Sequence, residues 1–304
     1  MSIRLIKQLI LSICGLAMML FFFGSITFAW VTMAQINNID GINISASAGD
    51  ELQISLDGIN YVTHLEEYPL TSEIRLKDVT SFDGRTFYRG AYSSFATAQL
   101  GIDYMGFDLH FRTLRNETGI FLVNKPTEED INLGLARGTY VTSNGVTFVP
   151  KVAYTEENNV LVLPQSIQTY YAKDAVRISM SELDEDDHII QTMIYDPSEN
   201  PDRGYGTYYG AYSYFIARTS SHLDLPHELP DTTYRLSLMD PYNPYQALDN
   251  QSLVAIMKDV PDDPYMYAKV RVYLWIEGWD ADAIDGIIND VINVQLEFKL
   301  ANPA

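Results

Sequence analysis

The sequence contains almost no cysteine. Its single one, Cys14, lies in an apolar run near the N-terminus, so the rest of the chain has no disulfide and no thiol nucleophile. A cysteine that carries a lipid usually follows a small residue, whereas Cys14 follows Ile13, and we interpret it as a small apolar side chain. About 270 residues follow this run, enough for a domain that buries most of its surface without disulfides.

Sequence motifs for catalysis are also lacking. The chain has no Gly-x-Ser-x-Gly nucleophile elbow and no phosphate-binding P-loop. Its 40 acidic residues always allow two carboxylates to be chosen, so they give no specific indication of a glycosidase. We therefore predict no catalytic residue, no cofactor and no enzymatic activity.

Metal-binding patterns are weak. The closest approach is the group His222, Asp224 and His227, but its spacing matches no usual ligand set, so we interpret it as a polar loop. We predict no metal site, with calcium at an acidic run as the weaker alternative, because these runs lack the ligand spacing of a calcium loop. The acidic runs are 182–187, 261–264 and 280–286.

Long apolar runs are confined to the N-terminus. After Arg4 and Lys7, residues 9–33 carry no charge, which is long enough to span a bilayer as a helix. The basic flank predicts that the short N-terminus stays in the cytoplasm and that the following residues lie outside the cell.

The fate of this apolar segment stays open between cleavage and a permanent anchor. Cleavage after Ala29 or Ala34 would remove it as a signal peptide, although its length exceeds the usual apolar region of such peptides. We predict a signal peptide or membrane anchor helix at 1–34 and an extracellular domain at 35–304.

Positive charge is scarce in the exported part. All 40 acidic residues but only 18 of the 20 basic residues follow position 34, which gives a formal charge of 18 minus 40, or -22. Such a field opposes binding to nucleic acid and favours solubility or the binding of cations. We therefore predict an acidic extracellular protein without a nucleic-acid partner.

Strand-like patterning dominates the exported part. Phe107, Leu109 and Phe111 alternate with polar residues, which is typical of a half-buried antiparallel strand. The acidic run 182–187 falls between two further strand-like stretches and predicts a hairpin loop. The other strand-like stretches are 176–180, 189–195, 269–278 and 292–300.

Three turn signals of the Asp-Gly or Asn-Gly type occur, at 57–58, 83–84 and 144–145. These pairs tolerate positive φ at both central positions, as the favoured hairpin turn requires. We expect β-hairpins at 57–58 and 144–145, and a turn at 83–84 before the next strand.

Together these patterns predict an all-β fold: an antiparallel, jelly-roll-like β sandwich behind the N-terminal helix. Two smaller β domains are the alternative. Prolines and tyrosines cluster near 197–267, where we expect an irregular insertion, because proline removes a donor from a sheet. We expect no long amphipathic helix after residue 34.

Tyrosine is unusually frequent, with 21 copies. Five copies lie too close together to share one buried strand face, so they predict an exposed candidate binding surface for sugar rings of a surface polysaccharide. Ordinary packing in a two-sided strand or a loop is the alternative. The five residues are Tyr205, Tyr208, Tyr209, Tyr212 and Tyr214.

The octapeptide at 208–215, "YYGAYSYF", shares six letters with "YRGAYSSF" at 88–95. The sequences that flank the two copies do not repeat, whereas a duplicated domain would repeat its strands and turns as well. We therefore expect two segments of similar geometry in one domain.

The stretch "GSITFAWVTMAQINNIDGINISASAGDELQISLDG" resembles the N-termini of the TasA/camelysin family, exported surface and matrix proteins of Firmicutes-type bacteria. The resemblance covers about residues 20–57, and "VRVYLWIEGWDADAID" is similar to a closing strand of surface proteins of the same style. It implies a jelly-roll domain that forms fibres, in which an N-terminal strand completes a neighbour's sheet. Mapped here, the donor strand contains Ile42, Ile44 and Ala46. Residues 197–267 depart from the family pattern, and no catalytic residue is implied.

Two functional hypotheses follow. The first is a non-enzymatic structural protein of a bacterial cell surface or extracellular matrix, anchored through residues 9–33 or secreted, that assembles into homo-oligomers or fibres. The alternative is a membrane-tethered module that binds a glycan or another surface polymer through the tyrosine-rich segment.

Overall fold

The computed structural model describes residues 37–47, 51–65, 75–76, 78–90, 95–221, 223–287 and 289–304. The predicted helix at 9–33 lies outside these ranges, and within them no helix is both long and apolar enough to cross a bilayer. Residues Gln35–Ala304 form one compact unit.

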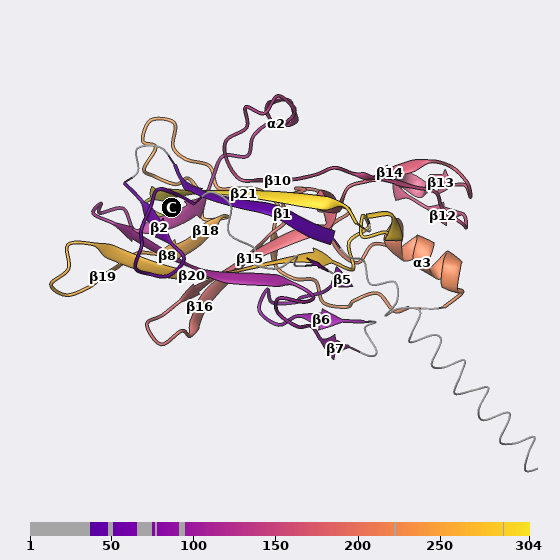
Figure 1. The fold of residues 1–304 in the computed structure, drawn as a ribbon, viewed down its shortest axis with the longest axis horizontal. Helices are drawn as coiled ribbons and strands as arrows, with labels where there is room; N and C mark the ends of the chain where they lie inside the picture. The colour runs from indigo at the N-terminus through magenta and orange to yellow at the C-terminus, as the bar shows by residue number, and fades with distance from the viewer. Residues whose placement is uncertain are drawn as a thin grey trace, which may run out of the picture. The chain divides into compact units, whose positions relative to one another are not determined.

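The protein is mostly β and is built on two mixed sheets, one of seven and one of eight strands (Figure 1). The seven-stranded sheet contains β1 (Asn37–Ala46), β3 (His64–Leu65), β4 (Arg75–Leu76), β9 (Gly119–Leu122), β10 (Tyr140–Ser143), β18 (Leu253–Ile256) and β21 (Val291–Ala301). The eight-stranded sheet contains β2 (Gln53–Ser55), β5 (Asp78–Val79), β8 (Met105–Thr113), β15 (Val176–Leu183), β16 (Ile189–Tyr195), β17 (Thr232–Thr233), β19 (Lys258–Asp259) and β20 (Met266–Glu277).

The sheets are not purely antiparallel, and that part of the prediction is wrong. The strand β1 runs parallel to β21, from Asn38 opposite Val291 to Ala46 opposite Phe298. Parallel neighbours need a long crossover connection, and here the whole domain between the two strands supplies it. Two shorter parallel pairs, β16 with β17 and β20 with β5, lie in the other sheet.

The two sheets share one hydrophobic core. Along β8 every second residue is buried, so the predicted alternation at Phe107, Leu109 and Phe111 is confirmed. The rings of Phe111 and Phe298, one from each sheet, meet edge to face with centroids 5.0 Å apart. This contact joins the inner faces of the sheets across the core.

A second apolar cluster covers part of the outer face of the eight-stranded sheet. Phe87 packs edge to face on Trp275 and on Tyr273, with centroid distances of 5.1 Å in both pairs, and stacks on Tyr104 at 4.1 Å. Because this second cluster buries the face of β20 that points away from the main core, the strands β15 and β20 are buried on both sides there.

Three two-stranded sheets and two α-helices complete the described part of the chain. We call residues 146–171, which hold two of these small sheets, the lobe; it lies at the right-hand end in Figure 1, opposite the C-terminus. The small sheets are β6 (Tyr88–Arg89) with β7 (Ala96–Thr97), β11 (Val146–Phe148) with β14 (Gln168–Tyr170), and β12 (Tyr154–Thr155) with β13 (Leu161–Val162). The helices are α2 (Glu128–Asn132) and α3 (Ala211–Thr219), with 3-10 turns η1 (Glu157–Asn159), η2 (Ala172–Ala175) and η3 (Asp285–Ile287).

The chain turns back at two of the three turn signals, but through longer loops than a two-residue hairpin turn and with positive φ at the glycine alone. Around 57–58, Ile54 and Val62 exchange both backbone hydrogen bonds, and Asp57 Oδ1 accepts the backbone N–H groups of Ile59 and Asn60 at 2.9 and 2.8 Å. Around 83–84, the chain turns back in the same way. Of the acidic run at 182–187, residues 184–187 lie in the predicted hairpin loop between β15 and β16, whereas Glu182 and Leu183 are buried at the end of β15.

The hairpin predicted at 144–145 is wrong. The strand β10 pairs with β21, whereas β11 pairs with β14, so the two strands beside the turn enter different sheets. Gly145 still has the positive φ that the signal indicates, and its backbone N–H donates to Asp290 Oδ1 at 3.0 Å. The turn therefore directs the chain out of the seven-stranded sheet and into the lobe.

Candidate functional site

The tyrosine-rich segment forms a loop followed by a helix. Its second half is α3, so neither alternative in the sequence prediction, a strand or a loop, describes it fully. At Gly210, which precedes the helix with φ of 62°, a Cβ atom would lie 2.3 Å from the carbonyl oxygen of Ala281. The close approach requires glycine. The helix ends at Ser220, whose left-handed backbone accompanies a hydrogen bond from its N–H to the carbonyl of Ile216.

The five tyrosines of the candidate surface do not form one exposed patch. Tyr214 is 3% exposed and packs edge to face against Phe148 and Tyr154 at 5.2 and 5.4 Å. Tyr205 is only half-buried, and its hydroxyl lies 3.3 Å from that of Thr80. Tyr214 therefore serves packing inside the domain, and Tyr205 contacts Thr80 through its hydroxyl.

Of the other three members, Tyr208 is exposed, whereas Tyr209 and Tyr212 are half-buried like Tyr205. Tyr208 is 78% exposed, and its ring meets that of Tyr212 edge to face with centroids 6.4 Å apart. The hydroxyl of Tyr212 donates to the carbonyl of Leu223 at 2.8 Å, and that of Tyr209 donates to the carbonyl of Asp202. The surface that remains for a ligand is thus Tyr208 with the fixed rings of Tyr209 and Tyr212.

A polar network lies beneath this aromatic surface and connects it to the lobe. The guanidinium of Arg203 donates to both oxygens of Asp282 and, at 3.0 Å, to Glu156 Oε2. The ring centroid of Tyr209 lies 5.6 Å from the guanidinium carbon, within cation–π range. Burial opposes the charge of Arg203, but its bonds to Asp282 raise the pKa of the guanidinium, which stays protonated.

Two tyrosine hydroxyls extend the network into the lobe. Tyr170 donates to Glu156 Oε1 at 2.6 Å, and the hydroxyls of Tyr154 and Tyr170 are hydrogen-bonded to each other. Burial raises the pKa of Tyr154 to about 12 and that of Tyr170 further. Both hydroxyls therefore stay protonated at neutral pH, which suits them to hold the network together and not to abstract a proton.

A second polar cluster is buried behind β15 and was missed by the sequence interpretation. Arg177, 2% exposed, lies 2.9 Å from Asp196 Oδ2 and 2.5 Å from Asp280 Oδ2. Glu277, 1% exposed, accepts hydrogen bonds from the Trp275 indole at 3.0 Å and from the backbone N–H of Trp279 at 3.2 Å.

Burial dominates the protonation of this Arg177 cluster. It raises the pKa of Glu277 to about 7, against the opposing effects of the Trp275 hydrogen bond and the Arg177 charge. Burial also raises the pKa values of Asp196 and Asp280, although the charge of Arg177 opposes the shift in both. Burial alone would lower the pKa of Arg177, but Asp196 and Asp280 together raise it, so the guanidinium stays charged.

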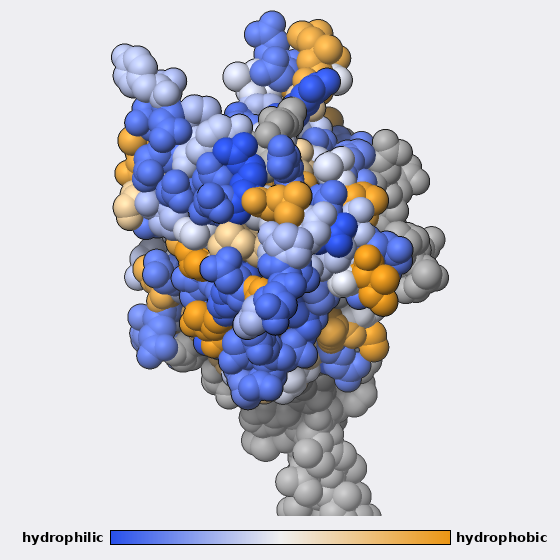
Figure 2. Space-filling model, turned by 90° about the vertical axis from the view of Figure 1, so that its left-hand side faces the viewer, coloured by the Kyte–Doolittle hydropathy of each residue, from blue (hydrophilic) through white to orange (hydrophobic). Residues whose placement is uncertain are grey.

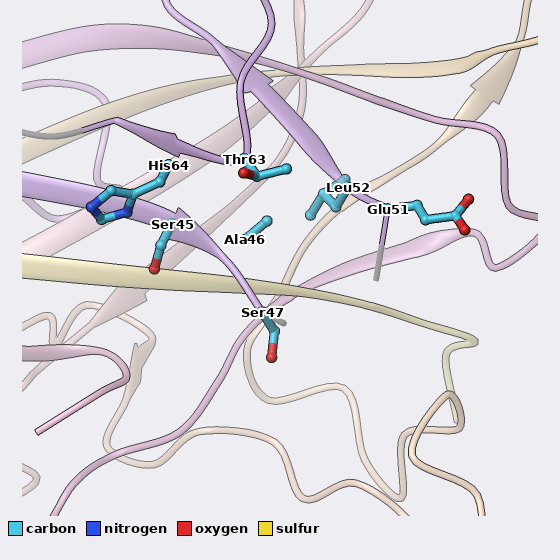
Figure 3. A pocket seen from close by; sticks show the side chains of 7 residues that line it. All are labelled: Ser45, Ala46, Ser47, Glu51, Leu52, Thr63 and His64. Atoms are coloured by element: carbon cyan, nitrogen blue, oxygen red, sulfur yellow. The ribbon is translucent and has the colours of Figure 1, made fainter. Parts of the chain in front are cut away.

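One surface hollow of about 330 Å³ lies at the end of β1, away from both polar clusters. Figure 3 shows His64 and Glu51 on opposite sides of it, with Ala46, Leu52 and Thr63 between them. Because the imidazole and the carboxylate do not converge, this arrangement presents no acid–base pair to a ligand.

Two of the residues weighed as metal ligands form ion pairs, and one is not described. Asp280 and Asp282 bind Arg177 and Arg203, and His222 lies outside the described residues. Among the residues that the structure describes, no group of three or more His, Cys, Asp or Glu side chains is placed to hold a metal ion.

The predicted donor strand is β1. Ile42 and Ile44 are fully buried in the core and Ala46 is half-buried against it, and all three pair with β21 of the same chain. Strand donation to a neighbour stays a prediction.

Comparisons of the chain with protein-family models, with characterised proteins and with solved structures gave no match.

Proposed function

We propose that the chain is a non-enzymatic structural protein of a bacterial cell surface or extracellular matrix, exported through residues 1–34 and then anchored or released. In this proposal its two sheets act as a jelly-roll-like β sandwich, and copies assemble by exchange of β1. The observation that carries the proposal is the position of β1, which follows the apolar N-terminal segment directly and completes the core of its sheet.

Four properties of β1 support an exchange between copies. It supplies the buried side chains of Ile42 and Ile44 to the core, so a copy that loses it leaves an apolar groove that only an equivalent strand fills well. Its pairing with β21 is parallel and extends over most of both strands. Its pairing with the described strands β3 and β4 covers only two positions each, at its ends. Because β1 is the first strand, it can leave without threading the chain through the sheet.

A disulfide across β1 and β21 tests the exchange. Asn43 lies opposite Gln295 in register, and both side chains are half-buried, so Asn43→Cys with Gln295→Cys places two thiols at the pair. In a Cys14→Ser background, oxidation of assembled protein is expected to give a ladder of covalently linked chains on a non-reducing gel. The same variant kept monomeric is expected to give an internal disulfide.

A matched pair inside one sheet serves as the control. Ser181→Cys with Thr192→Cys joins β15 to β16, whose partner hydroxyls are 2.8 Å apart, and is expected to cross-link only within a chain. Fibres whose β1–β21 disulfides all lie within single chains would contradict assembly through β1. If the exported protein forms no oligomers under any condition, this would contradict assembly altogether.

The exposure of Tyr208 favours a second candidate function, a membrane-tethered module that binds a glycan. A largely exposed ring held beside the fixed ring of Tyr212 offers a stacking surface for a sugar. Replacing Tyr208, Tyr209 and Tyr212 with Ala is expected to abolish binding to a cell-wall polysaccharide. Tyr242→Ala is the control, because Tyr242 is 96% exposed outside this group. Equal binding by both variants would contradict this function.

A further inference from the structure

The lobe carries large apolar side chains that face solvent. Leu161 and Leu163 stand two positions apart on β13 and its extension, so they share one side of the strand, whereas Val162 between them is buried. Ile167 is 75% exposed, and a turn in which Ser166 bonds to the carbonyl of Leu163 connects it to that strand. We call this surface the apolar lobe face; its members are Val149, Leu161, Leu163 and Ile167, each 44% to 75% exposed.

The members lie close together along the backbone. The β11–β14 register sets Phe148 opposite Gln168, so Val149 and Ile167 occupy the next opposed positions. The backbone N–H of Gln165 donates to the carbonyl of Pro150 at 3.0 Å, which joins the Leu163 turn to the end of β11. The residues that carry these exposed side chains therefore lie on neighbouring segments of the lobe.

Charge is absent from most of this part of the chain. From Asn158 to Tyr171 the sequence contains no Asp, Glu, Lys or Arg, although the protein as a whole carries a formal charge of -20. Figure 2 gives a contrast: it looks at the end away from the lobe and shows mainly hydrophilic residues, with apolar ones in small separate groups. An uncharged apolar surface on an acidic protein suits contact with a zwitterionic lipid surface, which neither attracts nor repels charge.

The start of β1 lies beside the base of the lobe. Asn38 is opposite Val291 in register. Asp290, which precedes Val291, accepts the backbone N–H of Gly145, just before β11, at 3.0 Å and that of Ala172, just after β14, at 2.9 Å. Only residues 34–36 separate β1 from the charge-free run 9–33. Even when fully extended, this connection reaches no more than about 14 Å. In a chain anchored through residues 9–33, this length limits the distance between the end of the anchor and the start of β1.

We infer that the apolar lobe face is a membrane-contact surface, which inserts Leu161, Leu163 and Ile167 into the outer leaflet of the membrane that anchors the chain. The inference rests on the anchored form of the proposed function. It gives the protein a second, shallow attachment that fixes the orientation of the domain over the bilayer. Free rotation about the short connection is thereby restricted.

A lipid-quenching experiment on the full chain tests the inference. In a Cys14→Ser background, an environment-sensitive fluorophore is attached at Leu161→Cys, or at Ile167→Cys in a second variant, and the chain is reconstituted in phosphatidylcholine nanodiscs. Quenching by spin-labelled lipid is expected to be at least about three times that at the control, Ile59→Cys. Ile59 is 78% exposed in the turn after β2, beside the opposite end of β1. Both lobe positions are exposed, so the variants are expected to fold like the parent.

The outcomes separate the alternatives. Equal lipid quenching at the lobe and at Ile59 would overturn the membrane contact while leaving the anchor and the proposed function intact. Protection from aqueous iodide at Leu161→Cys without lipid quenching would also overturn it, because another protein copy would then cover the face. A chain that does not co-purify with the nanodiscs at all would contradict both the anchor and this inference.

Discussion

The outer face of the eight-stranded sheet has a covered half and an open half, and the same kind of ion pair occurs in both. Arg177 lies opposite Trp275 on the β15–β20 ladder, and Arg271 lies opposite Ser181 on the same ladder and the same face. The side chain of Arg177 is 3% exposed and that of Arg271 is 32% exposed. Two arginines that look alike in the sequence are therefore expected to differ several-fold in their effect on stability.

The difference comes from what covers the sheet. Phe87 and the segment around it pack on Trp275, and the carbonyl of Gly204 accepts a hydrogen bond from Arg177, so water is excluded there. Near Arg271 the partners are Asp108 at 2.8 Å and, through Asp108, Lys269, which all keep contact with solvent. Burial makes an ion pair costly to break, whereas water screens an exposed one.

The largest effect is expected from Arg177→Met. The substitution leaves Asp196 and Asp280 buried without their positive partner, which costs about 3–5 kcal/mol of the free energy of unfolding. Urea denaturation of the exported domain at pH 7 measures this loss. Adding Asp196→Asn and Asp280→Asn to the same variant is expected to recover a large part of it. A loss below about 1 kcal/mol in the single variant would contradict the buried-pair interpretation.

The next largest effect is expected on the pH dependence of the free energy of unfolding, which the substitution Glu277→Gln reduces. Burial raises the pKa of this carboxyl from 4.5 to about 7, so the folded state holds the proton more tightly than the unfolded chain does. The stabilising contribution is complete below about pH 4.5 and is lost as the pH rises through about 7, a change of about 3 kcal/mol. Urea denaturation at pH 5 and pH 8 is expected to show a clearly smaller difference for the variant than for the parent.

Part of the pH dependence is expected to remain in Glu277→Gln. The buried carboxyls of Asp78 and Asp280 also have raised pKa values and titrate in the same direction. The indole of Trp275 donates to Glu277, so its fluorescence gives a local reading of the same titration. An unchanged slope and an unchanged fluorescence titration in the variant would show that Glu277 is ionised in the folded protein throughout.

Strands that bury only one face, against a single core, were predictable from the sequence. The alternation along 107–113 identifies β8 correctly, because a strand with one buried face repeats every two residues. The same rule does not identify the burial of Arg177, since β15 is buried on both faces by segments distant in sequence, those around Phe87 and Gly204. The only local sign is an arginine enclosed by apolar residues in "VRISM".

Short sequence signals gave wrong predictions where contacts with distant segments determine the strand pairing or the conformation. The turn at 144–145 has the expected glycine, but the strands beside it pair with different sheets, which no short-range pattern encodes. The two similar octapeptides likewise differ: Tyr88 lies in the short strand β6, whereas Tyr208 precedes a helix. The close spacing of tyrosines in the sequence identified the segment of the predicted tyrosine surface. It did not indicate the burial of Tyr214, which depends on Phe148 and Tyr154 in the lobe.

An intermediate effect is expected from Arg203→Gln, because this arginine lies between the two extremes, with its side chain 16% exposed. The substitution removes its charged hydrogen bonds to Asp282 and Glu156 and is expected to cost about 2 kcal/mol of unfolding free energy. A double-mutant cycle with Asp282→Asn isolates the pair. A coupling energy near zero in that cycle would mean that the ion pair of Arg203 contributes as little to stability as that of the more exposed Arg271.

The smallest effect is expected from Arg271→Gln. Asp108 binds both Arg271 and Lys269, so the loss of the guanidinium leaves the carboxylate with a second positive partner at 3.4 Å and with water. We expect a loss below about 1 kcal/mol that shrinks further in 1 M salt, whereas the loss in Arg177→Met is expected to persist there. The informative quantity is the ratio of the two losses at low and high salt, measured by urea denaturation. Equal losses for the two arginines would mean that the covering segment around Phe87 does not exclude water, and that burial does not distinguish the two halves of this face.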